Sequence, residues 1–292
     1  MKTILVTGTS TGIGFATAVS LIRAGHDVFA TMRDPAKSPE LLAKARGETL
    51  PITVIPLDVD SDESVAAGVA HVLKTRGRLD VLVNNAGIGQ LGSVEAMPLA
   101  QVRQMMETNY FGALRCIQAV LPGMRAQKSG RIINITSVSG KLASAGHSAY
   151  AASKFAVEAM SESLAAEVKP FNIRVNVVEP GVIETPIFGK TGDVSADPYS
   201  GARRMNAIFA ASLEQPVPAS VIGDQIRDIV ADESWQLRYP GGPAAAGIMG
   251  WRASMTDEQH IAIGALDDDG WCDYVTKNLG LNVRPHLKPS GQ

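Results

Sequence analysis

The residues of this sequence with the clearest chemical potential are Tyr150 and Lys154, which lie four positions apart. In a helix, positions i and i+4 share one face, so the phenol and the ammonium would project together from adjacent turns. A phenol loses its proton at about pH 10 in water, and a nearby cation favours the phenolate. The pair is therefore a candidate general acid/base, although the same spacing alone is more typical of a solvated surface pair.

A glycine-rich segment near the N-terminus supplies a second chemical signal. Gly8, Gly12 and Gly14 follow a short apolar run and precede an amphipathic stretch. Glycines at this spacing permit a tight turn, a close approach of the backbone to a pyrophosphate and close packing of a helix on a strand. Because the turn lies between the first predicted strand and the first predicted helix, a dinucleotide site is favoured over a turn without a ligand.

The elements that would position these residues alternate along the chain. Short runs that are apolar throughout and rich in β-branched residues are typical of parallel strands covered by helices on both faces. The predicted strands are residues 3–7, 27–31, 52–57, 81–84, 131–136 and 173–178, with a final strand at 236–239 that ends before Pro240. The predicted helices are residues 14–24, 61–75, 99–126, 149–169 and 218–231. The pattern predicts an α/β fold with a doubly wound parallel sheet.

A single catalytic domain of this kind would occupy residues 1–240. Within it, residues 186–215 contain glycines, prolines and a short amphipathic stretch, which is the profile of a substrate-binding insertion. Residues 241–292 form a C-terminal extension with three apolar clusters of its own, and we expect this extension to pack on the core.

Bulk properties argue against several classes of partner. The 292 residues carry a formal net charge of -2 and contain no long basic run, which disfavours nucleic acid and anionic membranes. No apolar stretch has the length of a membrane span. The two cysteines, Cys116 and Cys272, lack a metal-ligand spacing. We expect a small-molecule substrate, no metal site and a cytoplasmic location.

The glycine turn, residues 84–87, Ser137, Tyr150 and Lys154 occur in this order, and together they resemble the classical short-chain dehydrogenase/reductase family over residues 3–240. A likeness to the branch of 17β-hydroxysteroid and retinol dehydrogenases is carried by residues 29–35, 150–158 and 237–239. The resemblance implies a Rossmann-type three-layer sandwich, a homodimer or homotetramer, and hydride transfer between a nicotinamide dinucleotide and a secondary alcohol, ketone or aldehyde. A non-catalytic dinucleotide-binding sensor, or a lyase or epimerase on the same fold, is the alternative.

In the arrangement of that family, Tyr150 exchanges a proton with the substrate oxygen, and Ser137 donates a hydrogen bond to the same oxygen. Lys154 binds the ribose of the nicotinamide and stabilises the phenolate. Asn109 is implied to lie at a local distortion of its helix that holds a water connecting Lys154 to solvent. Without the other three residues, Asn109 would be an ordinary polar residue of a helix.

The resemblance also implies a cofactor site. Met32 occupies the acidic position of NAD-specific members, and Arg33 follows it. A guanidinium suits a phosphate dianion, which favours NADP, whereas a shifted alignment that uses Asp34 would favour NAD; otherwise Asp34 caps the next turn. Asp58 would contact the adenine, or alternatively is a signal for the start of a helix. The expected cofactor contacts are Gly8, Ser10, Thr11, Gly12, Ile13, Gly14, Arg33, Asp58, Val59, Asn85, Ala86, Gly87, Tyr150, Lys154, Pro180, Gly181, Ile183 and Thr185.

Substrate contacts have the weakest sequence signal. Besides Ser137 and Tyr150, the candidates are Gln90, Leu91, Leu142, His147, Val182 and Ile183. Their apolar character predicts a hydrophobic alcohol or carbonyl compound. For His147, a position in a loop exposed to water is the more common alternative.

Overall fold

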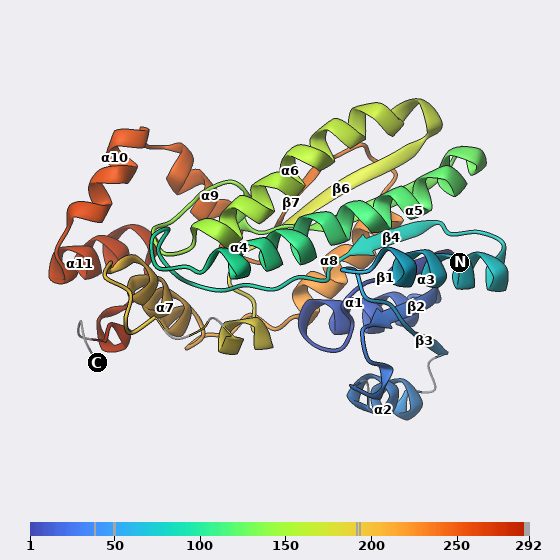
Figure 1. Cartoon of the computed structure of the whole chain (residues 1–292), viewed down its shortest axis with the longest axis horizontal. Helices are drawn as coiled ribbons and strands as arrows, with labels where there is room; N and C mark the ends of the chain where they lie inside the picture. Colours follow the sequence, from blue (N-terminus) through green and yellow to red (C-terminus); the bar gives the residue numbers. More distant parts are fainter. Residues whose placement is uncertain (38, 49–50, 191, 193, 289–292) are drawn as a thin grey trace.

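The computed structural model describes residues 1–37, 39–48, 51–190, 192 and 194–288. Its strands are β1 (Thr3–Val6), β2 (Asp27–Met32), β3 (Ile52–Pro56), β4 (Val81–Asn84), β5 (Gly130–Ile135), β6 (Ile173–Pro180) and β7 (Arg238–Gly241). They form one parallel sheet in the order β3-β2-β1-β4-β5-β6-β7 (Figure 1). The strand order reverses between β1 and β4, and such a reversal creates a crevice at the carboxyl ends of the strands.

Helices cover both faces of the sheet. The helices concerned are α1 (Gly12–Arg23) and α8 (Ser220–Ala231) on one face, and α3 (Asp62–Arg76), α5 (Gly112–Gln127) and α6 (Ser148–Val168) on the other. Ile4 and Leu5 are neighbours in β1, yet they belong to opposite apolar clusters, because successive side chains of a strand alternate between faces. The predicted doubly wound α/β fold is therefore confirmed.

Most predicted elements agree with the observed ones within two residues, and the exceptions have physical reasons. β7 includes Pro240, which fits because β7 is an edge strand that pairs with β6 alone. The predicted helix 99–126 is divided into α4 (Leu99–Met106), a π-helical turn (Glu107–Phe111) and α5. The sequence pattern did not indicate the short helix α2 (Pro39–Gly47).

The predicted insertion forms a 3₁₀ helix (Pro186–Lys190) and helix α7 (Gly201–Ser212). The C-terminal extension forms α9 (Ala245–Ala253), α10 (Asp257–Ala262) and α11 (Asp268–Leu279). Residues 191 and 193 of the insertion and 289–292 of the extension lie outside the described residues.

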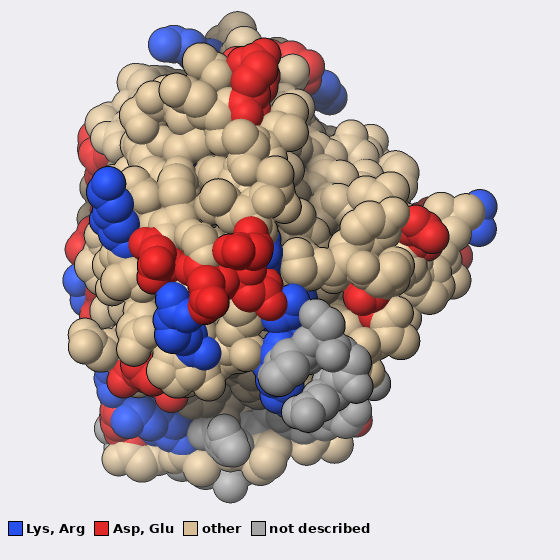
Figure 2. Space-filling model, turned by 90° about the vertical axis from the view of Figure 1, so that its left-hand side faces the viewer, with Lys and Arg blue, Asp and Glu red and all other residues tan. Residues whose placement is uncertain are grey.

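The last helix of the extension packs on the insertion. Trp271 and Val275 of α11 are buried against Ala207 and Ala211 of α7, in a cluster separate from those that cover the sheet. α11 therefore packs on the insertion of the catalytic domain, whereas α9 contacts β7. Asp268 of α11 pairs with two arginines of α7 at 2.9 and 3.0 Å. On this end of the molecule, acidic and basic side chains lie next to one another (Figure 2).

Candidate active site

A cavity of about 650 Å³ opens at the carboxyl ends of the strands. Its walls come from the turn after β1, the ends of β2, β3 and β4, the segments after β5 and β6, and helix α6. Every predicted cofactor contact except Gly14 lines this cavity. Its location at the reversal of strand order is where doubly wound sheets bind their ligands.

The glycine turn needs glycine because its backbone conformation and its close contacts leave no room for side chains. Gly8 and Gly12 have φ angles of 68° and 59°, which favour glycine. Gly14 lies behind the turn, where a Cβ would be 2.3 Å from the Gly8 carbonyl oxygen and 2.4 Å from Nδ2 of Asn85. This amide group donates to the carbonyl oxygens of Thr7 at 2.9 Å and Gly8 at 3.0 Å. Gly14 therefore allows α1 to pack under the turn.

Three of the four predicted catalytic residues meet in the cavity. Tyr150 and Lys154 line it from α6, and Ser137 lines it from the segment after β5. The Ser137 hydroxyl accepts a hydrogen bond from the backbone nitrogen of Ser139 at 3.1 Å. Nζ of Lys154 donates to the carbonyl oxygen of Ile135 at 2.9 Å. The tertiary structure thus brings the serine to the helical pair that the sequence indicated.

Burial governs the protonation of the helical pair. Burial raises the pKa of Tyr150 to about 12, and a hydrogen bond with Ser137 acts in the opposite direction. Burial lowers the pKa of Lys154 to about 8, and Glu158 acts to raise it. For the protein by itself, desolvation is the largest effect on the pKa of the phenol, and the stabilisation of the phenolate by Lys154 stays a prediction. Nζ of Lys154 lies over the phenol ring, 5.6 Å from its centroid.

Asn109 lies in the π-helical turn Glu107–Phe111, which confirms the predicted distortion of its helix. Its Oδ1 accepts from the backbone nitrogen of Ile88 at 2.8 Å. Its Nδ2 donates to the carbonyl oxygen of Ile88 and to the hydroxyl of Ser153, both at 2.9 Å. Asn109 lies behind the residues that line the cavity and holds the segment after β4 against α6. Single π-helical turns of this kind are frequent at functional sites.

The end of β2 presents the predicted cofactor-discriminating residues. Arg33 is exposed at the edge of the cavity, and Met32, the last residue of β2, also lines it. Asp34 accepts a hydrogen bond from the backbone nitrogen of Ala36 at 3.0 Å, as expected for a residue that caps the next turn. A guanidinium beside a glycine turn is chemically suited to a phosphate dianion.

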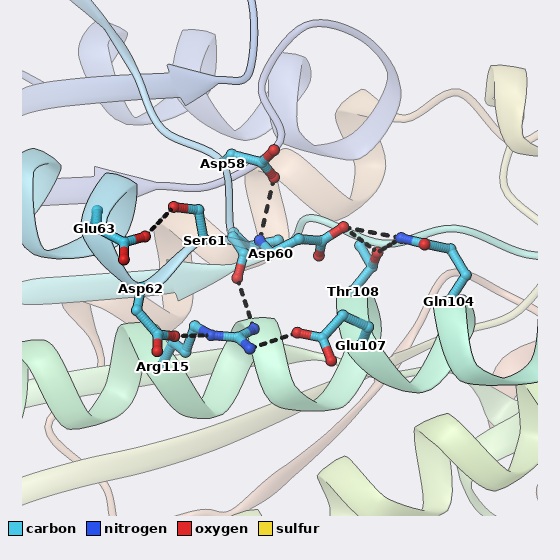
Figure 3. A network of polar contacts seen from close by, with 10 residues as sticks. Asp58, Asp60, Ser61, Asp62, Glu63, Gln104, Glu107, Thr108 and Arg115 are labelled. Carbon is cyan, nitrogen blue, oxygen red and sulfur yellow. Dashed lines mark hydrogen bonds and ion pairs between the residues drawn. The ribbon is translucent and has the colours of Figure 1, made fainter.

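A polar network borders the cavity beyond β3 (Figure 3). Oδ1 of Asp58 accepts from the backbone nitrogen of Asp60 at 3.1 Å. Oδ2 of Asp60 accepts from Gln104 and from Thr108, both at 3.0 Å. The residue that caps α3 is Ser61, and Asp58 binds the backbone of the turn that precedes this helix. The sequence pattern did not indicate Gln104 and Thr108 as cavity residues, because they come from α4 and the π-helical turn, which are distant from Asp58 in sequence.

The predicted substrate contacts divide into two groups. Gln90 and Ile183 line the cavity with Ser137 and Tyr150. The predicted contacts that lie outside its lining are Leu91, Leu142, His147 and Val182. The cavity residues on this side that the sequence did not single out are Ile88 and Gly89 from the segment after β4, and Pro186, Ile187, Phe188 and Lys190. The last four belong to the insertion 186–215, which the sequence predicted as a whole to bind substrate.

His147 is buried, with 8% of its surface exposed, so the alternative of an exposed loop histidine is wrong. Its ring stacks on that of Tyr150 with a centroid distance of 4.7 Å and an interplanar angle of 8°. The ring of Phe209 in α7 packs against the imidazole in a T-shaped arrangement, with a centroid distance of 5.7 Å. Phe209 also packs against Phe188, with a centroid distance of 4.8 Å. Burial lowers the pKa of His147 to about 4, so the imidazole is neutral at pH 7. Aromatic contacts therefore connect the insertion to Tyr150.

Similarity to known proteins agrees with this arrangement. The family model for "short chain dehydrogenase" matches residues 2–195. Retinol dehydrogenase 8 of Homo sapiens is 40% identical over 238 residues, which cover 78% of this chain and 75% of that protein. Estradiol 17-beta-dehydrogenase 1 of Rattus norvegicus is 40% identical over 193 residues, which cover 64% and 56%. A crystal structure of a short-chain dehydrogenase from Streptomyces avermitilis is 34% identical with a TM-score of 0.76, and the match covers 91% of this chain and 98% of that one.

Sheet order, cavity and relatives define the class as an oxidoreductase that uses a nicotinamide dinucleotide. The chain belongs to the short-chain dehydrogenase family. The predicted likeness to the branch of retinol and 17β-hydroxysteroid dehydrogenases is confirmed. In the part of the chain that the structure describes, no helix has the length and apolar character needed to cross a membrane.

Proposed function

We propose that the protein transfers a hydride between NADP(H) and a hydrophobic secondary alcohol, ketone or aldehyde. The observation that carries this proposal is the meeting of Ser137, Tyr150 and Lys154 with the glycine turn in one cavity. A proton-transfer group, a hydrogen-bond donor and a dinucleotide cradle can then act on one bound pair of reactants. Apolar cavity residues such as Ile88 and Ile187 favour a hydrophobic substrate.

The residues around the cavity fit the proposed cofactor. The open glycine turn would hold the pyrophosphate, since a Cβ on Gly8 would meet backbone atoms at 2.8 Å. Arg33 would hold the 2'-phosphate, Asp58 the adenine and Lys154 the ribose of the nicotinamide. When bound, the cofactor supplies a hydride to a carbonyl carbon or accepts one from an alcohol carbon.

The reaction assigns a distinct task to each catalytic side chain. The Tyr150 hydroxyl delivers its proton to the carbonyl oxygen during reduction and takes it back during oxidation. The raised pKa of Tyr150 keeps the phenol protonated at neutral pH, which suits the reducing direction. Ser137 donates to the same oxygen and holds the carbonyl group in place. The charge of Lys154 stabilises the phenolate that remains after proton transfer.

Replacement of Tyr150 by phenylalanine tests the acid/base assignment. General acid catalysis contributes roughly 10²- to 10⁴-fold, so Tyr150→Phe should lose at least that factor while NADPH still binds. The assay is oxidation of NADPH and NADH with steroid, retinoid, aliphatic and aromatic carbonyl compounds, with binding followed by cofactor fluorescence. Wild-type turnover by the variant would refute the assignment. A wild-type protein that binds NADPH and converts no substrate in either direction would instead support the non-catalytic sensor.

Replacement of Arg33 by alanine tests the preference for NADP. Hydrogen bonds to charged groups contribute about 1.5–3 kcal/mol, and because Arg33 is exposed we expect the lower part of this range, about tenfold. Arg33→Ala should weaken NADPH by this factor and leave NADH nearly unchanged. Arg125→Ala, at an exposed arginine of α5, is the matched control. An equal loss for both cofactors would refute the phosphate assignment.

We also propose that the protein forms a homodimer or homotetramer. Phe111, next to α5, and Phe155, on α6, are each 43% exposed, and exposed aromatic rings are frequent at subunit contacts. Light scattering measures the mass in solution. Phe155→Glu should lower it, and a monomeric wild-type protein would contradict the proposal.

A further inference from the structure

A buried charged cluster lies behind the catalytic residues, and the reaction described above does not use it. The cluster consists of Glu158 on α6, Glu179 in β6 and Arg238 in β7. The two glutamates are only 4% and 2% exposed. Carboxyl groups are rarely buried to this degree unless they are paired, because removing a charge from water is costly.

One guanidinium serves both buried carboxyl groups. Nε of Arg238 donates to Oε2 of Glu158 at 3.0 Å and lies 3.8 Å from Oε1 of Glu179. The other oxygen of Glu158 accepts from the hydroxyl of Thr136 at 2.7 Å. In the described part of the chain, Oε1 of Glu179 is buried without a hydrogen bond. Glu158 therefore has the more complete set of hydrogen-bond partners of the two carboxyl groups.

Glu158 is connected to the reacting groups in two ways. It follows Lys154 by four residues on α6, so the carboxylate and the ammonium share one face of the helix. Thr136, which Glu158 binds, stands between Ile135, whose carbonyl oxygen accepts from Lys154, and Ser137. A carboxylate at this place shares a helix face with the lysine and is hydrogen-bonded to the residue that precedes the serine.

We propose that Glu158 is a positioning residue: its charge keeps Lys154 protonated, and its hydrogen bond to Thr136 holds Ser137 in place for the substrate oxygen. The proposal rests on the function proposed above, because it assigns Glu158 an effect on the lysine and serine of that reaction. Glu158 does not line the cavity and acts through these residues.

The surrounding charges agree with this assignment. Burial lowers the pKa of Lys154 to about 8, and the charge of Glu158 acts to raise it. Burial raises the pKa of Glu179 to about 7, Glu158 adds to this rise, and Lys141 and Arg238 oppose it. The titratable and charged groups around the cluster are Tyr150, Lys154 and Glu162 from α6, Lys141 from the segment after β5, Glu179 from β6 and Arg238 from β7.

The pH profile of carbonyl reduction tests the charge of Glu158. In the wild-type enzyme, kcat/KM should decline above a pH of about 8, where Lys154 loses its proton. Glu158→Gln should move this alkaline limb down by about one pH unit, because a nearby opposite charge is lost. Glu162→Gln is the matched control: Glu162 pairs with the same arginine at 2.5 Å but is exposed, and the limb should stay in place.

Arg238→Gln should move the alkaline limb in the opposite direction. This variant also tests the proposal if Glu158→Gln does not fold. Without the cation, the carboxylate of Glu158 acts on Lys154 unopposed at alkaline pH, so the limb should move up. An unchanged limb in folded Glu158→Gln, or a downward movement in Arg238→Gln, would overturn the proposal. A purely structural role would lower kcat or Tm in these variants without moving the limb.

A failure of the proposed function is distinguishable from a failure of this inference. If the wild-type protein converts no carbonyl compound, the proposed function has failed. The pH dependence of NADPH binding, measured by cofactor fluorescence, then still reports the protonation of Lys154. A downward movement of that binding profile in Glu158→Gln would support the effect of Glu158 on Lys154, and an identical profile in both proteins would refute it.

Discussion

Replacement of His147 by phenylalanine should change how the stability of the protein depends on pH. The imidazole is buried against Tyr150 and Phe209, and burial lowers its pKa to about 4. In the unfolded chain the pKa of histidine is about 6.5. Between these values the unfolded chain binds a proton that the folded protein does not bind. This stability is therefore fully present above a pH of about 6.5 and is lost as the pH falls toward 4.

The size of the effect follows from the two pKa values of His147. Each pKa unit corresponds to about 1.4 kcal/mol, so the loss approaches about 3 kcal/mol well below pH 4. At pH 5 the same linkage lowers the free energy of unfolding by about 2 kcal/mol relative to pH 8. Phenylalanine retains a ring that can stack on Tyr150 but has no proton to exchange. All other titrating groups are common to both proteins, so their effects cancel in the comparison.

Urea denaturation at pH 5 and pH 8, followed by tryptophan fluorescence, measures this difference. From pH 8 to pH 5 the wild-type protein should lose about 2 kcal/mol more unfolding free energy than His147→Phe. His71→Phe, at an exposed histidine of α3, is the control and should behave like the wild type. Equal losses in the wild type and His147→Phe would mean that His147 titrates alike in the folded and unfolded states, and would refute the reasoning.

Gly14→Ala should lower stability by about 1–3 kcal/mol and weaken NADPH binding, because its Cβ would be 2.3 Å from the Gly8 carbonyl oxygen. Thermal melting and cofactor titration measure both effects, and unchanged values would contradict the packing role of Gly14. Asn109→Ala should cost roughly 2–4 kcal/mol and reduce kcat, because two backbone groups of Ile88 lose their partner. A wild-type kcat in this variant would contradict that role. Trp271→Ala should cost about 3–5 kcal/mol and raise KM through α7, and an unchanged KM would separate the extension from the substrate site.

Local signals were sufficient to predict most of the fold and the cofactor end of the site. Strands such as Val81–Asn84 were predicted because buried parallel strands are continuously apolar, a property of each segment alone. The glycine turn was predicted because its spacing reflects close backbone approaches within one strand-turn-helix unit. The match of Tyr150 and Lys154 is equally local, since one helix carries both residues.

Contacts between distant segments could not be predicted in the same way. The π-helical turn at Asn109 places side-chain hydrogen bonds on Ile88, 21 positions away, and on Ser153, 44 positions away. Gln104 reaches Asp60 across a similar separation, which brings α4 to the cofactor end of the cavity. The individual residues of the substrate wall were missed in part because Ile187 and Phe188 come from an insertion whose conformation has no periodic sequence pattern.

The sequence by itself determined the succession of most strands and helices along the chain, the glycine turn and the helical pair of Tyr150 and Lys154. The tertiary structure decided which of these groups are removed from water. Desolvation is the sum over all elements that surround a group, so no single spacing reports it. For this reason the raised pKa of Tyr150, the neutral imidazole of His147 and the buried charge of Glu158 emerge only from the folded chain.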